Sequence, residues 1–159
     1  MTDMTISRLP EDFSRWDELL GLILSAFAYM DGVIDPPSSA HRLTPESLRQ
    51  KAGDETCFIA TVDGRLAGCI FAAERDDVLY IGKLAVHEAS RGLGIGRMLM
   101  QAAERHALKI DKSVLELQTR IELVANHATF ARLGFVEFVR TAHEGYDRPT
   151  SLTMRKRLS

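Results

Sequence analysis

The chain has 159 residues, of which 45% are hydrophobic and 26% are charged, and its formal net charge is −2 at pH 7. A chain of this size can bury a core without disulfide or metal staples, so we expect residues 1–159 to form a single domain. The near-neutral charge offers no electrostatic footprint for a nucleic acid or a membrane surface, and neither is expected as a partner.

The first segment with helical spacing carries apolar side chains at intervals of three and four residues from Phe13 to Phe27. Pro10 and the two acidic residues after it are typical of a helix start. Within this helix, the run LLGLILSAFA (19–28) is too short to span a bilayer, and the acidic residues before it do not fit a signal peptide. We therefore expect a cytoplasmic protein.

The next segment, DGVIDPPSSAHRL (31–43), loses all periodicity and contains two prolines, which predicts an unusually long loop of the kind that tends to be functional. A short helix follows, with Thr44 as its N-cap. Three strands then form a meander: TCFIATV (56–62), RLAGCIFAAE (65–74) and VLYIGKLAV (78–86).

The two cysteines, Cys57 and Cys69, lie in the first two of these strands, which the Asp-Gly dipeptide at 63–64 joins in a two-residue hairpin. In that register Cys57 pairs with Ile70 and Cys69 pairs with Phe58, so the thiols are expected on opposite faces of the sheet. We expect no disulfide. The chain has no Cys-x-x-Cys pair and no i, i+4 histidine pair, so no metal site is predicted.

Beyond the meander the chain alternates between helical and extended patterns. We expect a helix over 95–109, a strand over 114–119, a short helix over 125–133 and strands over 135–141 and 150–156. The element order βααβββαβαββ predicts the α+β class, with a mixed α/β sheet covered by helices.

The stretch RGLGIGRML (91–99) places three glycines between a strand and a helix. It does not match the dinucleotide fingerprint, because the third glycine of that pattern would fall on Arg97, and the chain also lacks the ATP loop. What remains is a glycine loop that runs into a helix, whose free amides and dipole attract an anion. The alternative is a tight turn in which the glycines only avoid steric clashes.

Two signatures in the right order carry a resemblance to a known family. Arg91, Gly94 and Gly96, after a strand that ends in LAV (84–86), strongly resemble the coenzyme A pyrophosphate loop of the GNAT (Gcn5-related) N-acetyltransferase superfamily. The run NHATFARLGF (126–135) resembles that family's second signature. The resemblance covers nearly the whole chain and implies a GNAT-type fold, a central, mostly antiparallel sheet of about seven strands with helices on both faces.

The resemblance also implies acetyl-CoA as co-substrate, with its pantetheine arm between the splayed fourth and fifth strands. An unpaired amide of that splayed edge can stabilise the oxyanion that develops on the thioester. Asn126 would bond the pantetheine and Phe130 would pack near the sulfur, although Asn126 can also be a helix N-cap. The expected coenzyme-binding residues are Leu84, Ala85, Val86, Arg91, Gly92, Leu93, Gly94, Ile95, Gly96, Asn126 and Phe130.

The reaction implied by the resemblance is acetyl transfer to a primary amine of a small molecule or peptide, which attacks the thioester directly. At pH 7 only about one in 2,500 molecules of an amine with a pKa of about 10.4 is free base. A base must take that proton, or the pocket must desolvate the ammonium. The candidate bases are Glu122, Glu74 and His143.

The chain departs from the family pattern at two positions. Phe130 stands where many members have a tyrosine that acts as general acid, and Tyr80 stands where certain members have a catalytic glutamate. Tyr146 and Tyr80 are possible substitutes for the acid. We therefore take Glu122, His143 and Tyr146 as candidate catalytic residues, and the alternative function is a non-catalytic acyl-CoA-binding or sensing module with the same fold.

Acceptor specificity in such folds depends on the segment between the first two helices and on the C-terminal strands. These regions contain several carboxylates that can hold a cationic amine if they are not simply solvated. The residues concerned are Asp31, Asp35, Pro36 and Pro37, with Glu144, Tyr146 and Asp147 opposite. Exposed strand edges at the C-terminal end make a homodimer plausible.

Overall fold

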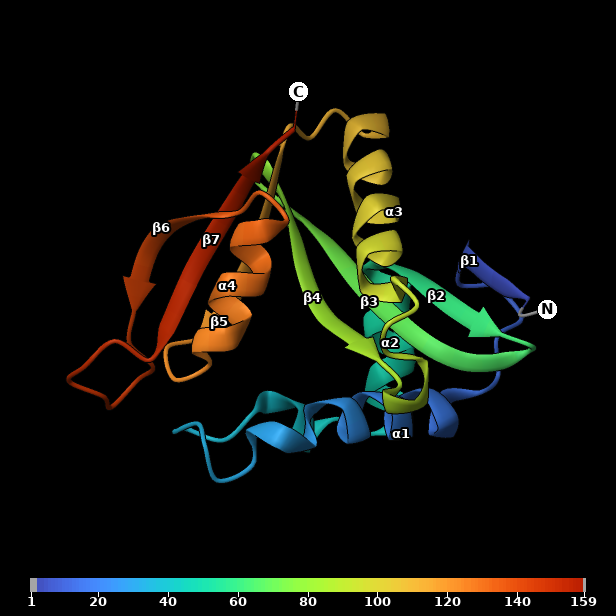
Figure 1. Ribbon diagram of the computed structural model, residues 1–159, viewed down its shortest axis with the longest axis horizontal. Helices are drawn as coiled ribbons and strands as arrows, with labels where there is room; N and C mark the ends of the chain where they lie inside the picture. The colour runs from blue at the N-terminus through green and yellow to red at the C-terminus, as the bar shows by residue number, and fades with distance from the viewer. Residues whose placement is uncertain (1–2, 159) are drawn as a thin grey trace.

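A computed structural model describes residues 3–158 and shows one seven-stranded sheet in the order β1-β2-β3-β4-β5-β7-β6 (Figure 1). The strands are β1 (Met4–Arg8), β2 (Thr56–Val62), β3 (Arg65–Arg75), β4 (Val78–Val86), β5 (Val114–Arg120), β6 (Val136–Thr141) and β7 (Ser151–Arg157). All neighbouring strands are antiparallel except β4 and β5, which are parallel. The expected mixed, mostly antiparallel sheet is confirmed.

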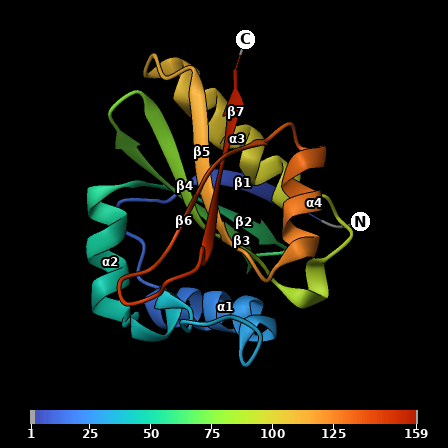
Figure 2. The same ribbon diagram turned by 90° about the vertical axis from the view of Figure 1, so that its left-hand side faces the viewer.

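Helices cover both faces of this sheet (Figures 1 and 2). They are α1 (Trp16–Phe27), α2 (Pro45–Asp54), α3 (Ile95–Lys109) and α4 (Val124–Arg132), with the 3-10 turns η1 (Ala28–Met30), η2 (Ser39–Arg42) and η3 (Glu88–Ser90). On one face, Leu19 and Ile23 of α1 and Leu48 of α2 pack on the sheet, and on the other face Leu99 of α3 packs on it. Within residues 3–158, no helix is long and apolar enough to cross a membrane.

Local sequence signals account for several helix ends. α2 begins as predicted, because the Thr44 side chain accepts a hydrogen bond from the Ser47 amide at 3.0 Å and the Ser47 hydroxyl accepts one from the Thr44 amide at 2.9 Å. α1 begins at Trp16, later than the apolar pattern suggested, because residues 11 and 12 form a turn before it. The long loop predicted over 31–43 is present and contains the short turn η2.

The register of β2 and β3 corrects the expectation for the cysteines. A bulge between Ala60 and Thr61 shifts the pairing by one residue, so Cys57 lies opposite Phe71 and Cys69 lies opposite Ile59. Both thiols therefore lie on the same face, in the core under α1 and α2, and both are free. Within residues 3–158, no three His, Cys, Asp or Glu side chains are grouped so that they could hold a metal ion.

β4 and β5 form a fork, and this fork creates the space for the site. The two strands pair over only three positions, Leu79 with Leu115, Tyr80 with Glu116 and Ile81 with Leu117, and then separate. β5 continues along β7 for its whole length, while β4 stays with β3 after a register shift at which Lys83 has a φ of +49°. Past residue 81, the edge of β4 that faces β5 has no strand partner among residues 3–158.

Candidate functional site

A cavity of about 850 Å³ occupies the fork between β4 and β5. Its walls come from both strands, from the first turn of α3, from α4, and from the segment that contains η1 and η2. We name its two parts by the elements that close them. The α3 end contains Leu84, Gly96, Arg97, Asn126, Thr129, Phe130 and Arg132, and the η2 end contains Ser39, Arg42, Lys51, Tyr80, Lys83, Arg120 and His143.

The glycine loop lies at the α3 end and leaves backbone amides free. Gly92 and Gly94 have φ values of +87° and +78°, in the left-handed region that favours glycine. Gly94 is the N-cap of α3 and has no side chain to bond the first turn. The free N–H groups and the positive end of the helix dipole are therefore suited to an anion, beside Arg97, which lines the cavity.

The residues predicted to bind the coenzyme are distributed along this end. Leu84, Gly96, Asn126 and Phe130 line the cavity. Ala85 and Ile95 are buried, Val86 is half-buried, and Arg91, Gly92, Leu93 and Gly94 are exposed in the loop. The alternative role of Asn126 as an N-cap is wrong, because α4 begins two residues earlier with Leu123 as its N-cap.

Tyr29 of η1 was not predicted as a site residue, and the structure brings its hydroxyl to α4. The Asn126 side-chain amide donates a hydrogen bond of 2.9 Å to the Tyr29 hydroxyl oxygen, and both residues line the cavity. The hydroxyl keeps its own proton for another acceptor. Phe130, one helical turn after Asn126, is half-buried on the same wall. The sequence does not identify Tyr29 as a site residue, since it follows an ordinary amphipathic helix.

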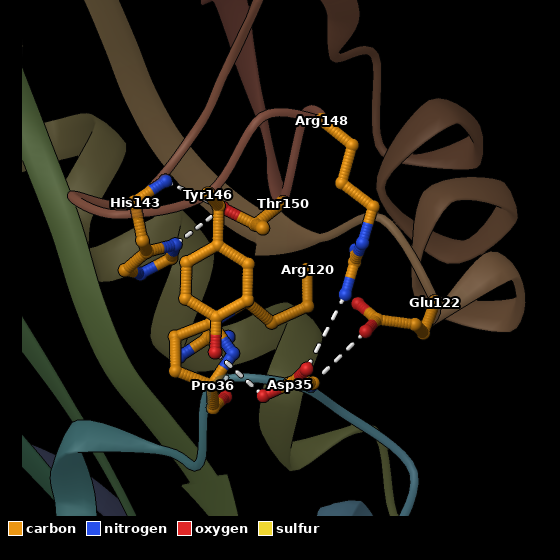
Figure 3. A network of polar contacts seen from close by, with 8 residues as sticks. All are labelled: Asp35, Pro36, Arg120, Glu122, His143, Tyr146, Arg148 and Thr150. Atoms are coloured by element: carbon orange, nitrogen blue, oxygen red, sulfur yellow. Dashed lines mark hydrogen bonds and ion pairs between the residues drawn. The ribbon is translucent and has the colours of Figure 1, made fainter.

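The three candidate catalytic residues lie around Asp35 in one polar network (Figure 3). The Tyr146 hydroxyl donates to Asp35 Oδ1 at 2.6 Å, and the Asp35 amide donates to Glu122 Oε2 at 3.0 Å. The His143 Nδ1 atom and the His143 amide both contact the Thr150 hydroxyl. The structure thus brings together residues that are separate in the sequence.

His143 is the one of these three that lines the cavity. Thr150 holds the ring through Nδ1, and the Nε2 atom makes no hydrogen bond to any other residue of the segment 3–158. Partial burial, then the positive charge of Arg120, lower the pKa of His143, while the Glu122 carboxylate opposes this shift. A neutral imidazole near neutral pH follows, which suits a proton acceptor.

Tyr146 and Glu122 are held by the network and are not part of the cavity wall. The hydrogen bond to Asp35 raises the pKa of Tyr146 and directs its proton to that carboxylate. Glu122 Oε1 is buried and has no hydrogen-bond partner within residues 3–158. Glu74, the third candidate base, is exposed near the end of β3 opposite Leu79 and does not line the cavity.

Tyr80, the other candidate for the missing acid, lines the cavity beside Arg75. The Arg75 guanidinium lies 3.8 Å from the centre of the Tyr80 ring. Burial raises the pKa of Tyr80, against the effect of that cation. The hydroxyl therefore keeps its proton across the neutral range.

None of the loop carboxylates considered for a cationic acceptor lines the cavity. Asp31 pairs with His41 at 2.7 Å, and Asp35 bonds Tyr146 and lies 3.4 Å from Arg148. Glu144 and Asp147 are exposed in the β6–β7 loop. Of the loop residues named with them, Pro36 and Pro37 do line the cavity, and their carbonyl oxygens accept hydrogen bonds from Arg120 at 2.6 and 3.1 Å.

Comparison with known sequences identifies one family. A sequence profile of the acetyltransferase (GNAT) family matches residues 16–135, which include the fork and both glycine-containing signatures. No curated protein sequence matches the chain.

Solved structures share the fold. An acetyltransferase of the GNAT family from Staphylococcus aureus has a TM-score of 0.77 at 16% identity, and the match covers 99% of this chain and 100% of that chain. A GNAT family acetyltransferase from Elizabethkingia anophelis with acetyl-CoA bound has a TM-score of 0.69 at 17% identity, with 98% of each chain covered. The ribosomal-protein-S18-alanine N-acetyltransferase from Escherichia coli has a TM-score of 0.70 at 20% identity, with 99% and 95% covered.

Proposed function

Because the chain belongs to the acetyltransferase (GNAT) family, we propose that it transfers the acetyl group of acetyl-CoA directly to a primary amine of a small molecule or peptide. The observation that carries the proposal is the cavity in the β4–β5 fork, which joins an anion site at one end to polar and basic side chains at the other. A thioester held in the fork lies between these two ends.

The α3 end fits coenzyme A. The glycine loop and the first turn of α3 provide amides for its pyrophosphate, and Arg97 and Arg132 provide positive charge on the same wall. The unpaired edge of β4 at Leu84 offers backbone groups to the pantetheine amides. The Thr119 hydroxyl lines the fork, is buried, and has no partner within residues 3–158, so it is available to a polar group of the substrate.

His143 is the proposed proton acceptor. An amine that attacks the thioester carbon forms a C–N bond and must lose a proton, which a neutral imidazole can accept at Nε2. This requires the tautomer in which Nδ1–H donates to the Thr150 hydroxyl oxygen. Thr150 is buried and also accepts a hydrogen bond from the His143 amide, so it fixes the ring against the cavity.

Tyr29 is the proposed proton donor. The C–N bond forms first, and the C–S bond breaks when the tetrahedral intermediate collapses. The departing thiolate, whose thiol has a pKa of about 8.5, then takes up a proton. Tyr29 lines the cavity, as Phe130 does, and its hydroxyl oxygen accepts a hydrogen bond from the Asn126 side-chain amide, which leaves its O–H free to donate. Tyr146, by contrast, already gives its proton to Asp35.

The test is acetyl-CoA-dependent thiol release with a panel of amino acids, polyamines, aminoglycosides and lysine peptides, with hydrolysis in the absence of amine as the blank. Binding of acetyl-CoA is measured by calorimetry on the same preparation. Release above the blank for one acceptor class supports the proposal. Tight binding without release for any acceptor would favour a non-catalytic acyl-CoA-binding module, and absence of binding would refute both functions.

A further inference from the structure

Basic side chains line the cavity at both of its ends. Six basic residues line it, and none of the described residues that line it is Asp or Glu. Arg97 and Arg132 belong to the α3 end, where the proposed coenzyme phosphates account for them. The remaining four, at the η2 end, are Arg42 of η2, Lys51 of α2, Lys83 of β4 and Arg120 of β5.

Among the described residues, only one of these four cations forms an ion pair with an acidic side chain. Lys51 pairs with Glu55 at 2.7 Å, and Arg120 donates to the carbonyl oxygens of Pro36 and Pro37. Lys83, in contrast, donates only to the neutral Ser39 hydroxyl, at 3.0 Å. The Arg42 side chain forms no hydrogen bond or ion pair with any other residue of the segment 3–158. The η2 end thus holds unneutralised positive charge.

The position of Lys83 makes this charge unfavourable without a ligand. Lys83 is half-buried at the register shift where β4 leaves β5. Burial lowers the pKa of Lys83, and the nearby positive charges of Lys51, Arg42 and Arg120 lower it further, while the Glu55 carboxylate, already paired with Lys51, opposes this shift. A cluster of like charges in a partly desolvated wall is costly alone and is relieved by an anion.

We propose that the η2 end binds a carboxylate of the acceptor through Lys83 and Arg42, so that the acceptor is an amine that carries a carboxylate group, as a free amino acid does. This inference rests on the proposed function, because the bound molecule is an acceptor only if the protein is a transferase. A polyamine or an aminoglycoside, which brings only positive charge, is disfavoured by the same wall.

The experiment compares L-amino acids with their carboxamides, which keep the amine and remove the negative charge. Binding of each pair to the protein saturated with coenzyme A is measured by calorimetry, and turnover is measured by thiol release from acetyl-CoA. We expect the carboxylate form of the preferred side chain to bind at least about tenfold more tightly than its carboxamide.

The variant Lys83→Met keeps the length of the side chain and removes its charge. We expect it to raise the KM of the amino acid about ten- to hundredfold, to leave the carboxamide nearly unaffected and to keep the Kd of acetyl-CoA. Lys83→Arg should restore most of the binding. The matched control is Lys109→Met on the exposed end of α3, outside the cavity wall, which should behave as the unmodified protein.

The failures of the two proposals are distinguishable. If amino acids and carboxamides bind equally, or if Lys83→Met weakens acetyl-CoA and leaves acceptor selectivity intact, the carboxylate site is refuted and the cations serve the coenzyme. If carboxylates bind selectively and depend on Lys83 but no amine is acetylated, the anion site stands and the transferase function fails.

Discussion

At the α3 end of the cavity, one continuous stretch of chain, residues 84–97, provides most of the expected contacts through its backbone. At the η2 end, side chains arrive from η2, α2, β4, β5 and the β6–β7 loop, and no two of them are neighbours in the sequence. The α3 end depends on glycines and on the start of a helix, where few other residues can replace those present. The η2 end depends on individual side chains, which can change one at a time, and this is the part that we expect to determine the acceptor.

The largest effect is expected from Gly94→Asp at the α3 end. The change places a carboxylate at the N-cap of α3, beside the proposed pyrophosphate site, and like charges in contact cost several kcal/mol, or about a thousandfold in the Kd of acetyl-CoA. Calorimetric titration with acetyl-CoA measures this.

Gly94→Asn separates charge from backbone strain at the same position. Asn has nearly the shape of Asp and tolerates the left-handed conformation that Gly94 adopts, with φ at +78°. We expect this neutral variant to bind acetyl-CoA much more tightly than Gly94→Asp. Equal affinities of the two variants for acetyl-CoA would show that the loop has only a steric role and would contradict the assignment of the pyrophosphate site.

His143→Gln is expected to have the next largest effect, this time on kcat. Loss of the proton acceptor should lower kcat about a hundredfold at neutral pH, with little change in acetyl-CoA binding. The control is His106→Gln, because His106 contacts Thr56 outside the cavity wall. If the His143 variant keeps its full kcat, His143 is not the proton acceptor. Solvent would then take the proton of the amine, or desolvation in the pocket would deprotonate the ammonium.

The pH profile tests the same residue by a different observable. Burial and Arg120 lower the pKa of His143, so its proton-accepting form persists below the ordinary value of about 6.5. For the unmodified protein, kcat should therefore stay high as the pH falls through the ordinary histidine value and decline only below the lowered pKa. In His143→Gln this decline should be absent or displaced.

The contrast between the two ends also explains what the sequence could predict. The glycine loop, the capped start of α2 and the strand meander are local patterns, and each was found where expected. The β2–β3 bulge at Ala60 and the shift at Lys83 are single-residue irregularities that no periodicity reports. The first moved the cysteines to one face. The second separates β4 from β5 at the position of a basic residue that the sequence reading left unassigned.

Residues that meet only through tertiary structure were missed for the same reason. Tyr29 accepts a hydrogen bond from Asn126, which lies 97 residues later in the chain, and the Asp35 carboxylate, one of those that could hold an amine, bonds Tyr146. The second contact depends on how the long loop over 31–43 packs against the β6–β7 loop. The composition of that loop shows that it contains carboxylates, but it does not show which of them are already paired.

Tyr29→Phe is expected to lower kcat about tenfold, because the departing thiolate then takes its proton from water. Phe130 lies one turn from Asn126 on α4, so the double variant Tyr29→Phe with Phe130→Tyr returns a hydroxyl to the same wall. We expect this double variant to recover part of kcat, measured by thiol release at saturating acceptor. A double variant no faster than Tyr29→Phe, or a single variant with full activity, would contradict the assignment.

The smallest effect is expected from Asp35→Asn at the rim of the η2 end. Asparagine still accepts the Tyr146 hydroxyl but no longer attracts Arg148, and exposed ion pairs contribute little to stability, so thermal unfolding should change only slightly. The hydrogen bond to Asp35 raises the pKa of Tyr146, so loss of the carboxylate charge should lower that pKa toward its ordinary value. Ultraviolet titration of tyrosinate measures this shift. The KM of the acceptor should rise about two- to threefold, because the Tyr146 network only supports the loop that carries Pro36. A loss of activity as large as that of His143→Gln would instead place Asp35 in the proton transfer itself.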